Sequence, residues 1–415
     1  MNGKTLATIS VVALVLLAGC GALGGTGSTP TTTDVTGGDT PTATPADDET
    51  TPTTGPTGTK TTTAGPTGAS EVVPGVSAQR VNATKLYSAH QQAVNRSAAV
   101  KQTVDVRNDG PGRQRQTITL EYGTFDGNRR SFEVVNETPN AKRTWWLNTG
   151  SRELALRVDN ETGTKHVYAK NDPGTMFGAV YVISAYYRMP GSALQQGNYE
   201  YTGNVTRDGQ TYLQLEATGL AQSGGGSGSG AKSSAFGTGN ETRTGLSGTV
   251  LVSPDGAIHS MDLSFSYEED GSTHTRTVEF ALERGDSLGL TAPSWLSDLP
   301  DASGTYQNDG TVYAVEYASG PTIPDGTELT IKGGYSALGT ATLSESVEPG
   351  ETMYVYATGG TNQNITVHVS VGAEPDLPAD AMTLEGNQVV LSATVGDLQF
   401  SIGPNRTATG NWNSS

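Results

Sequence analysis

The sequence predicts a mainly β protein with two helices, an α+β class in which an antiparallel half-barrel-like domain precedes a β-sandwich domain. Most of the chain beyond about residue 70 consists of short segments in which apolar and polar residues alternate, as they do in half-buried strands. Turn sequences such as Asp-Gly separate these segments and favour antiparallel hairpins. Only two segments have the period or the continuous apolar character of a helix.

The first 20 residues predict an export signal. Lys4 supplies a positive charge, and residues 6–17 form an apolar run that falls short of the roughly 20 residues of a membrane-spanning helix. Residues 17–20 (Leu-Ala-Gly-Cys) match the lipobox, whose cysteine is lipidated and becomes the new N-terminus, and Cys20 is the only cysteine. We therefore expect a lipid-anchored protein on the outer face of the cell membrane. The alternative is an uncleaved anchor helix with an incidental cysteine.

Residues 21–71 predict a disordered stalk. They are rich in Thr, Pro, Gly and Asp and contain almost no apolar residue, so they cannot bury a core. The stalk would span between roughly 40 Å as a flexible coil and 150 Å when extended. Its Thr/Pro richness suits O-glycosylation, and a bare tether is equally compatible with the sequence.

The first folded domain is expected over residues 72–299. It opens with an amphipathic helix at 83–95, for which Asn82 is placed as the N-cap. Residues 176–189 are apolar nearly all round and lie between Pro173 and Pro190, which predicts a second, buried helix. A shift in the alternation near Ser260 predicts a β-bulge. Strands are expected at 98–107, 116–122, 130–135, 142–147, 153–158, 165–169, 199–206, 210–217, 246–253, 258–267 and 275–283, with a flexible Gly/Ser loop at 222–240.

The second domain is expected to be a β-sandwich over residues 304–403, after a boundary at 297–303. Every recognisable element in it is a short strand bounded by Gly, Pro or Asp turns. A polar tail follows at 404–415. The strands are expected at 311–317, 328–332, 341–347, 352–357, 365–371, 388–394 and 398–402.

The charge of the chain limits its partners. It has 42 acidic and 25 basic residues and a formal net charge of −17. This balance argues against nucleic acid, whose phosphates need a cationic surface. Acidity with few lysines is typical of adaptation to molar salt, where charges are screened within about 3 Å; an ordinary acidic secreted protein is the alternative. Nine Asn-x-Ser/Thr sequons are candidate glycosylation sites: Asn82, Asn95, Asn136, Asn160, Asn204, Asn240, Asn364, Asn405 and Asn413.

Three short motifs of the first domain carry a family resemblance. They are Leu-Tyr-Ser-Ala-His at 86–90, the run from 248 to 256 (GTVLVSPDG) and Ala-Pro-Ser-Trp at 292–295. Over residues 75–300 the chain thereby resembles a family of haloarchaeal lipoproteins of unassigned function. The order helix, meander, buried helix, meander is also similar to the lipoprotein-carrier and mycobacterial lipoglycan-carrier fold. That second resemblance implies a curved half-barrel closed by helices over an apolar cavity.

No catalytic or metal-binding pattern is recognisable. The histidines do not stand at metal-ligand spacing, although a zinc site built from sequence-distant histidines stays open; they are His90, His166, His259, His274 and His368. Residues 225–233 nearly match a phosphate loop, but Ala231 replaces its second glycine, so a linker is predicted. We expect no enzymatic activity, no cofactor and no metal.

Aromatic residues concentrated between positions 145 and 212 are the remaining indication of function. They predict either a single core or an apolar ligand cavity between the sheet and the second helix. Neighbouring residues of a strand point to opposite faces, so one of two adjacent tryptophans is expected at the surface or at a cavity mouth. The candidate cavity residues are Trp145, Trp146, Phe177, Tyr181 and Tyr186.

These observations favour a non-enzymatic binding or carrier lipoprotein for an apolar small molecule or lipid, such as an isoprenoid. The alternative is a structural or adhesive cell-envelope protein whose β-sandwich contacts the surface layer. The expected partners are the membrane, through the lipid on Cys20, and either the apolar ligand or a surface-layer protein. A lipid that co-purifies with the protein would separate the two hypotheses.

Overall fold

The computed structural model describes residues 71–78, 80–110, 115–125, 129–221, 242–285, 288–333, 336–360 and 363–405. The predicted export signal, the stalk as far as residue 70, the Gly/Ser loop and the tail from residue 406 lie outside the described residues. Among the helices that are described, none is both long enough and apolar enough to cross a membrane.

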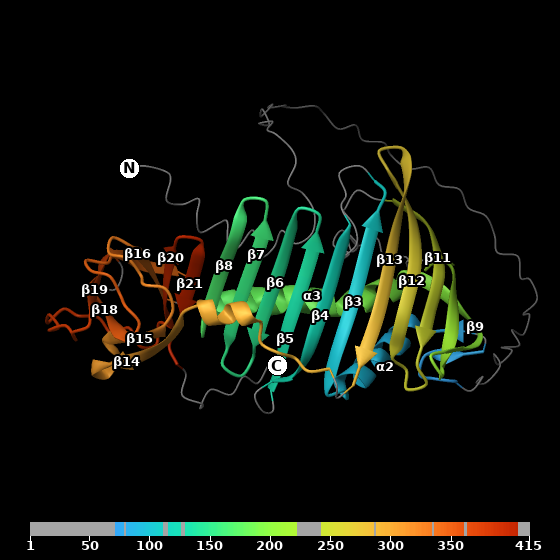
Figure 1. Ribbon diagram of the computed structural model, residues 1–415, viewed down its shortest axis with the longest axis horizontal. Helices are drawn as coiled ribbons and strands as arrows, with labels where there is room; N and C mark the ends of the chain where they lie inside the picture. Colours follow the sequence, from blue (N-terminus) through green and yellow to red (C-terminus); the bar gives the residue numbers. More distant parts are fainter. Residues whose placement is uncertain are drawn as a thin grey trace, which may run out of the picture.

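The predicted fold class is confirmed, because the described chain is mainly β with two α-helices (Figure 1). Short strands β1 (Val76–Ser77) and β2 (Arg80–Val81) precede helix α2 (Ala83–Asn95), and helix α3 (Pro173–Leu194) separates two antiparallel meanders. The first meander contains β3 (Ala99–Asn108), β4 (Gln116–Phe125), β5 (Arg129–Thr138), β6 (Ala141–Asn148), β7 (Glu153–Asn160) and β8 (Gly163–Lys170). The second contains β9 (Gly197–Arg207), β10 (Gln210–Leu220), β11 (Thr242–Val252), β12 (Ile258–Glu269) and β13 (Ser272–Arg284).

The C-terminal part forms the predicted sandwich. Its first sheet has the order β14-β15-β18-β19, and its second begins β17-β16-β20-β21. A buried apolar core lies between them and includes Tyr313, Tyr317 and Phe400. The elements are the 3-10 helix η1 (Ser294–Asp298) and strands β14 (Asp301–Gln307), β15 (Val312–Ser319), β16 (Glu328–Gly333), β17 (Ser336–Thr342), β18 (Glu351–Gly360), β19 (Gln363–Val371), β20 (Val389–Val395) and β21 (Leu398–Ile402).

Two details of the sandwich differ from expectation. Strand β14 begins at Asp301, inside the stretch expected to be a boundary. The strand predicted at 341–347 is wrong, because β17 ends at Thr342 and Val347 instead forms an isolated bridge with Ile323.

Strand β21 joins the sandwich to the first meander. It pairs in parallel with β8, from Leu398 opposite His166 to Ile402 opposite Lys170. One fifteen-stranded sheet therefore runs through both parts of the chain, in the order β17-β16-β20-β21-β8-β7-β6-β5-β4-β3-β13-β12-β11-β10-β9. Independent folding of residues 304–403 stays a prediction, and this shared sheet makes its test more informative.

Helix α2 has the bounds and the cap that the sequence predicts. The side chain of Asn82 accepts a hydrogen bond from the backbone N–H of Lys85, at 3.0 Å, which satisfies one of the free donors of the first turn. The predicted β-bulge is confirmed as well, because the β11–β12 register shifts between Leu251 opposite Ser260 and Val252 opposite Ile258.

His90 fixes α2 to the sheet. Its side chain is 1% exposed, and its Nδ1 accepts a hydrogen bond from the backbone N–H of Ile258, at 3.2 Å. Burial, assisted by the charge of Arg284, lowers the pKa of the His90 imidazole to about 4. His90 is therefore neutral in the folded protein at pH 7.

Lowering the pH from 7 to 5 is expected to remove about 2 kcal/mol of stability through His90 alone. The unfolded chain binds the proton at the ordinary pKa of about 6.5, so stability falls as the pH drops below that value towards 4. The variant His90→Asn keeps a hydrogen-bond acceptor and does not titrate. Denaturant unfolding at both pH values should show a smaller loss of stability on acidification for the variant than for the original protein. Equal losses would contradict the titration of His90 as their cause.

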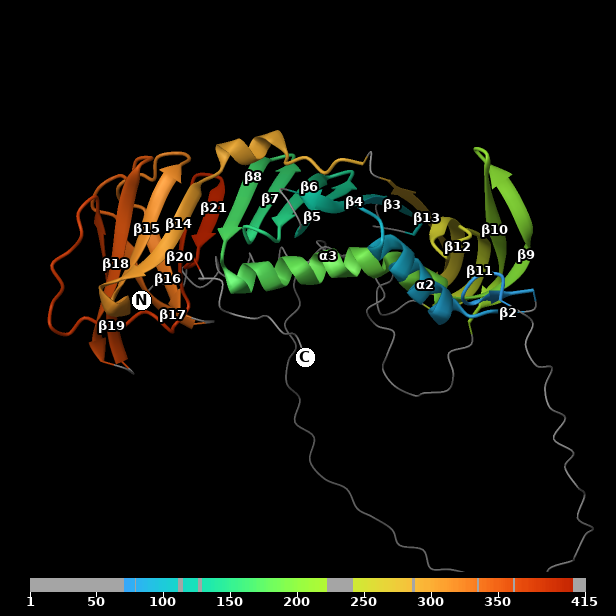
Figure 2. The same cartoon turned by 90° about the horizontal axis from the view of Figure 1, so that it is seen from below.

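Helix α3 is longer than the predicted segment 176–189. It begins after the N-cap Asp172, whose Oδ1 accepts hydrogen bonds from the backbone N–H groups of Gly174 and Thr175 at 3.0 and 3.3 Å. Pro190 lies inside the helix rather than at its end, and the last turn beyond it is buried. Figure 2 shows the sheet bending around α3 and α2, so that both helices cover its concave face.

Candidate apolar ligand layer beneath helix α3

Helix α3 is fixed at both of its ends. At the N-terminal end, Ser401 Oγ of β21 donates a hydrogen bond to Asp172 Oδ2, at 2.8 Å. At the C-terminal end, Gly191 lies against the ring of Tyr87 on α2, where a Cβ atom would come within 2.4 Å of the ring. The helix thus crosses the concave face between two close contacts.

The middle of α3 contacts the sheet through Tyr186. The buried hydroxyl of Tyr186 accepts a hydrogen bond from Asn136 Nδ2 of β5, at 2.8 Å. Its ring packs edge-to-face on Trp145 of β6, with centroids 6.1 Å apart. These contacts place Tyr186 in the apolar core that the two meanders share with α2 and α3.

The opposite face of α3 is exposed. Phe177 is 76% exposed, Tyr181 63% and Val180 47%. The prediction that this helix is buried all round is therefore wrong. A single helix on a sheet packs through one face, so the remaining apolar side chains of α3 face outward.

The apolar layer under α3 extends to the surface along its flanks. Several apolar side chains of α3 and of the strands beside it pack against the core and are only partly buried: Phe132, Val158, Val167, Met176, Val182 and Tyr187. Apolar side chains next to α3 are therefore in contact with the core and partly accessible to solvent.

Three buried polar groups interrupt the apolar core on the concave side of the sheet. Gln102 on β3 is 1% exposed and lies opposite Leu120 on one side and Leu282 on the other. Neither its Nε2 nor its Oε1 bonds to any group of the described chain, and the same holds for Trp145 Nε1 and the Tyr199 hydroxyl. Burial also raises the pKa of Tyr199. An unmade buried hydrogen bond costs about 1–3 kcal/mol, so each of these groups calls for a polar partner.

The five predicted cavity residues do not line one cavity. Trp145 and Tyr186 meet under α3, whereas Phe177 and Tyr181 point outward from it. Trp146 faces the convex side but is only 3% exposed, so the surface position expected for one tryptophan is wrong. The alternative position, at a cavity, agrees with the structure, because Trp146 lines a cavity on that side. Trp146 is covered because the C-terminal core packs against that side, where it joins Tyr168 and Leu299.

The convex side holds a cavity of about 360 Å³ next to Trp146. In it Lys170 Nζ lies 2.9 Å from Asp301 Oδ1 and 3.3 Å from Glu153 Oε1. Burial lowers the pKa of Lys170, but the hydrogen bond to Asp301 and the charge of Glu153 outweigh it, and the pKa is raised overall. The lysine charge is therefore matched within the protein, and this cluster ties β14 to β7 and β8.

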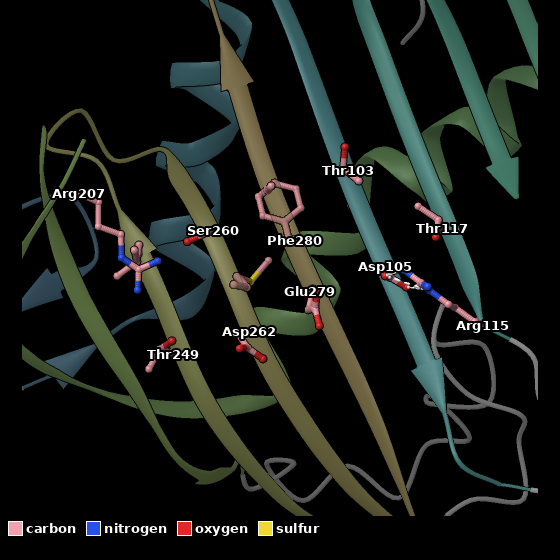
Figure 3. A pocket seen from close by; sticks show the side chains of 13 residues that line it. Thr103, Asp105, Arg115, Thr117, Arg207, Thr249, Ser260, Asp262, Glu279 and Phe280 are labelled. Carbon is pink, nitrogen blue, oxygen red and sulfur yellow. Dashed lines mark hydrogen bonds and ion pairs between the residues drawn. The ribbon is translucent and has the colours of Figure 1, made fainter. Parts of the chain in front are cut away.

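A second convex-side cavity, of about 520 Å³, is a groove across β4, β3, β13, β12 and β11, lined by polar and apolar side chains (Figure 3). Arg115 Nε lies 3.1 Å from Asp105 Oδ1, and Arg107 bridges Asp105 and Glu279. Partial burial raises the pKa of Asp105, but hydrogen bonds from both arginines lower it below its ordinary value. This groove is not among the features predicted from the sequence; its signal is the set of hydroxyl residues at outward strand positions: Thr103, Thr117, Thr249 and Ser260.

Asn136 is excluded as a glycosylation site in the folded protein. It is 1% exposed, and its Nδ2, the atom that would carry the glycan, donates to Tyr186. Exposed sequons are Asn82, Asn95, Asn160, Asn204 and Asn405. The described residues give no information on Cys20, on Asn240 and Asn413, or on the side chain of Asn364.

No group of three or more His, Cys, Asp or Glu side chains within the described ranges has a metal-binding arrangement.

Comparison with known proteins gives limited similarity. No protein-family model and no curated protein matches the chain. A DUF1329 family protein from Desulfovibrio piger is 10% identical, with a TM-score of 0.18, over 50% of this chain and 95% of that one. A LolA superfamily protein from Nitrosomonas europaea is 9% identical, with a TM-score of 0.14, over 52% of this chain and 97% of that one. Similarity at this level defines neither fold nor function.

Proposed function

We propose that this protein is a non-enzymatic carrier that holds an amphiphilic, mainly apolar molecule between the concave face of its sheet and helix α3. The observation that carries the proposal is the Gln102 carboxamide, buried between leucines with both polar atoms unbonded to the described chain. A ligand with an apolar body and a hydrogen-bonding group would fill such an environment and satisfy the amide.

The flanks of α3 provide the entry route in this proposal. The partly exposed Phe132 and Tyr187 pack against the core on which α3 lies. A chain-like molecule could enter beside the helix while the contacts at Asp172 and Gly191 hold its ends. The ligand would then replace contacts between α3 and the sheet in the middle of the helix. An isoprenoid lipid has the shape and polarity that this route requires.

The carrier is further proposed to be held at the outer face of the membrane by a lipid on Cys20. The lipobox motif and the solitary cysteine support this location. Cys20→Ser should abolish partitioning into the detergent phase and leave a longer precursor. A Cys20→Ser protein that still carries a lipid would contradict the anchor without affecting the carrier proposal.

Mass spectrometry of molecules that co-purify with the folded protein tests the carrier. We expect one apolar molecule in near-stoichiometric amount, bound about tenfold more weakly by Gln102→Leu. The same substitution should raise the stability of the ligand-free protein by about 1–3 kcal/mol, because it removes an unsatisfied amide. Weaker ligand binding together with higher stability would identify Gln102 as a ligand contact. A structural defect would instead lower both binding and stability.

Gln116→Leu is the matched control on the neighbouring strand. Its Nε2 donates to Asn136 Oδ1 at 3.0 Å, so the substitution breaks a hydrogen bond and should lower stability. A protein that carries no apolar molecule and binds no apolar dye, with Gln102→Leu neutral in both assays, would contradict the carrier.

A structural role is the second candidate, and the continuous sheet favours it. Fifteen hydrogen-bonded strands link the two parts of the chain into one extended body, as a spacer in the cell envelope requires. Contact with a surface-layer protein would then occur through the sandwich. The absence of any co-purified ligand, together with binding of the sandwich to isolated surface-layer material, would favour this role.

A further inference from the structure

The side of α3 that faces away from the sheet is open along most of its length (Figure 2). The exposed apolar side chains of α3 form a stripe that no described residue covers. We define the α3 stripe as Phe177 together with Val180 and Tyr181, which follow it by one helical turn. Within the described ranges, the only other exposed large apolar side chain is Val72. Three of four such residues on one helix turn form a patch, and patches of this kind mark interaction sites.

The charge around the stripe differs from that of the whole protein. Although the chain has 42 acidic residues, neither α2 nor α3 contains one. The only permanently charged residues of the two helices are Lys85 and the exposed Arg188, which follows the stripe on the same face of α3. Aromatic side chains beside an exposed arginine and no carboxylates suit a surface that meets lipid headgroups.

We propose that the α3 stripe docks on the surface of a lipid bilayer, with Phe177 and Tyr181 inserted at the level of the headgroups. A single tyrosine or phenylalanine buries about 150–250 Å², so the stripe offers less than about 500 Å². A stable dimer needs about 800 Å² from each partner, which disfavours a second copy of the chain as the occupant.

The predicted tether brings the bilayer within reach. Residues 21–70 connect Cys20 to the first described residue, and a flexible chain of this length spans roughly 40 Å. The concave side could therefore lie flat on the membrane. The use of this contact for ligand exchange rests on the proposed function, whereas docking itself does not.

Vesicle flotation tests the docking with the chain from residue 21 to residue 415, which lacks the predicted signal and anchor but contains every described residue. We expect binding to neutral phosphatidylcholine vesicles that persists in molar salt, because apolar contacts are not screened. The double variant Phe177→Ser/Tyr181→Ser should bind the vesicles at least about tenfold more weakly. Both positions are exposed, so its unfolding transition should remain that of the original protein.

Val72→Ser is the matched control, because among the described residues it removes the one exposed large apolar side chain outside α3 and should leave flotation unchanged. Vesicle binding that is absent, or equal in the double variant, would overturn the proposal. A dimer in sedimentation equilibrium that the double variant dissociates would identify a second copy as the occupant and would also overturn it. If no apolar molecule co-purifies with the original protein while flotation is intact, the carrier function alone is contradicted.

Discussion

Tyr186→Ala is expected to lower the free energy of unfolding by about 3–5 kcal/mol, the range for removal of a large buried aromatic side chain. The substitution empties the space beside Trp145 and leaves Asn136 Nδ2 without its acceptor, deep in the core. Denaturant unfolding of the full chain measures the loss.

Tyr181→Ala provides the comparison on the same helix. Its side chain is 63% exposed, so the same change should alter stability by no more than about 0.5 kcal/mol. Nearly equal losses for the two variants would mean that α3 does not present Tyr186 to the sheet and Tyr181 to solvent. The pair therefore tests the orientation on which both proposals depend.

Gly248→Ala is expected to cost about 3 kcal/mol or more. Gly248 has a φ of +127°, in the middle of β11, and an added Cβ would lie 2.0 Å from the backbone oxygen of Asp262 on β12. The substitution therefore combines backbone strain with a clash against another backbone, which no side-chain movement relieves.

Gly245→Ala on the same strand is the control for Gly248→Ala. Its Cβ would meet the Ser266 side chain at 3.5 Å, an ordinary contact, and its φ is not in the left-handed region. Its stability should be unchanged or raised by about 0.4–1 kcal/mol. Equal unfolding midpoints for the two variants would show that β11 adopts another register.

Local signals explain why most of the fold is predictable from the sequence. Helix α2 is found with its bounds because Asn82 and the stripe from Leu86 to Val94 specify it without reference to the rest of the chain. The bulge near Ser260 is likewise visible as a change in alternation. Features of this kind depend on a dozen residues or fewer.

The sequence predictions are wrong where contacts between residues distant in the chain determine the structure. Pro190 is a reasonable helix end, yet α3 continues through it because Gly191 and Leu194 are buried in the tertiary structure. Strand β14 has little alternation of its own and becomes a strand by pairing with β15. Trp146 looks like a surface residue until the C-terminal core covers it.

The candidate site is predictable only in outline. The aromatic cluster correctly brings Trp145 and Tyr186 together, because both belong to segments that adjoin the same core. Gln102 has no signal in the sequence, since a glutamine at an inward strand position is an ordinary exception to alternation. Its importance appears only when the register places it between Leu120 and Leu282.

The parallel pairing of β8 with β21 has a consequence for how the chain reaches its folded state. These strands are separated by the whole of α3, the second meander and most of the sandwich. Pairs so distant in sequence close late and slowly. A chain that crosses a membrane N-terminus first would therefore complete its first meander while β8 is still an open edge, which can recruit strands of other molecules. The last strand to emerge is the one that closes it.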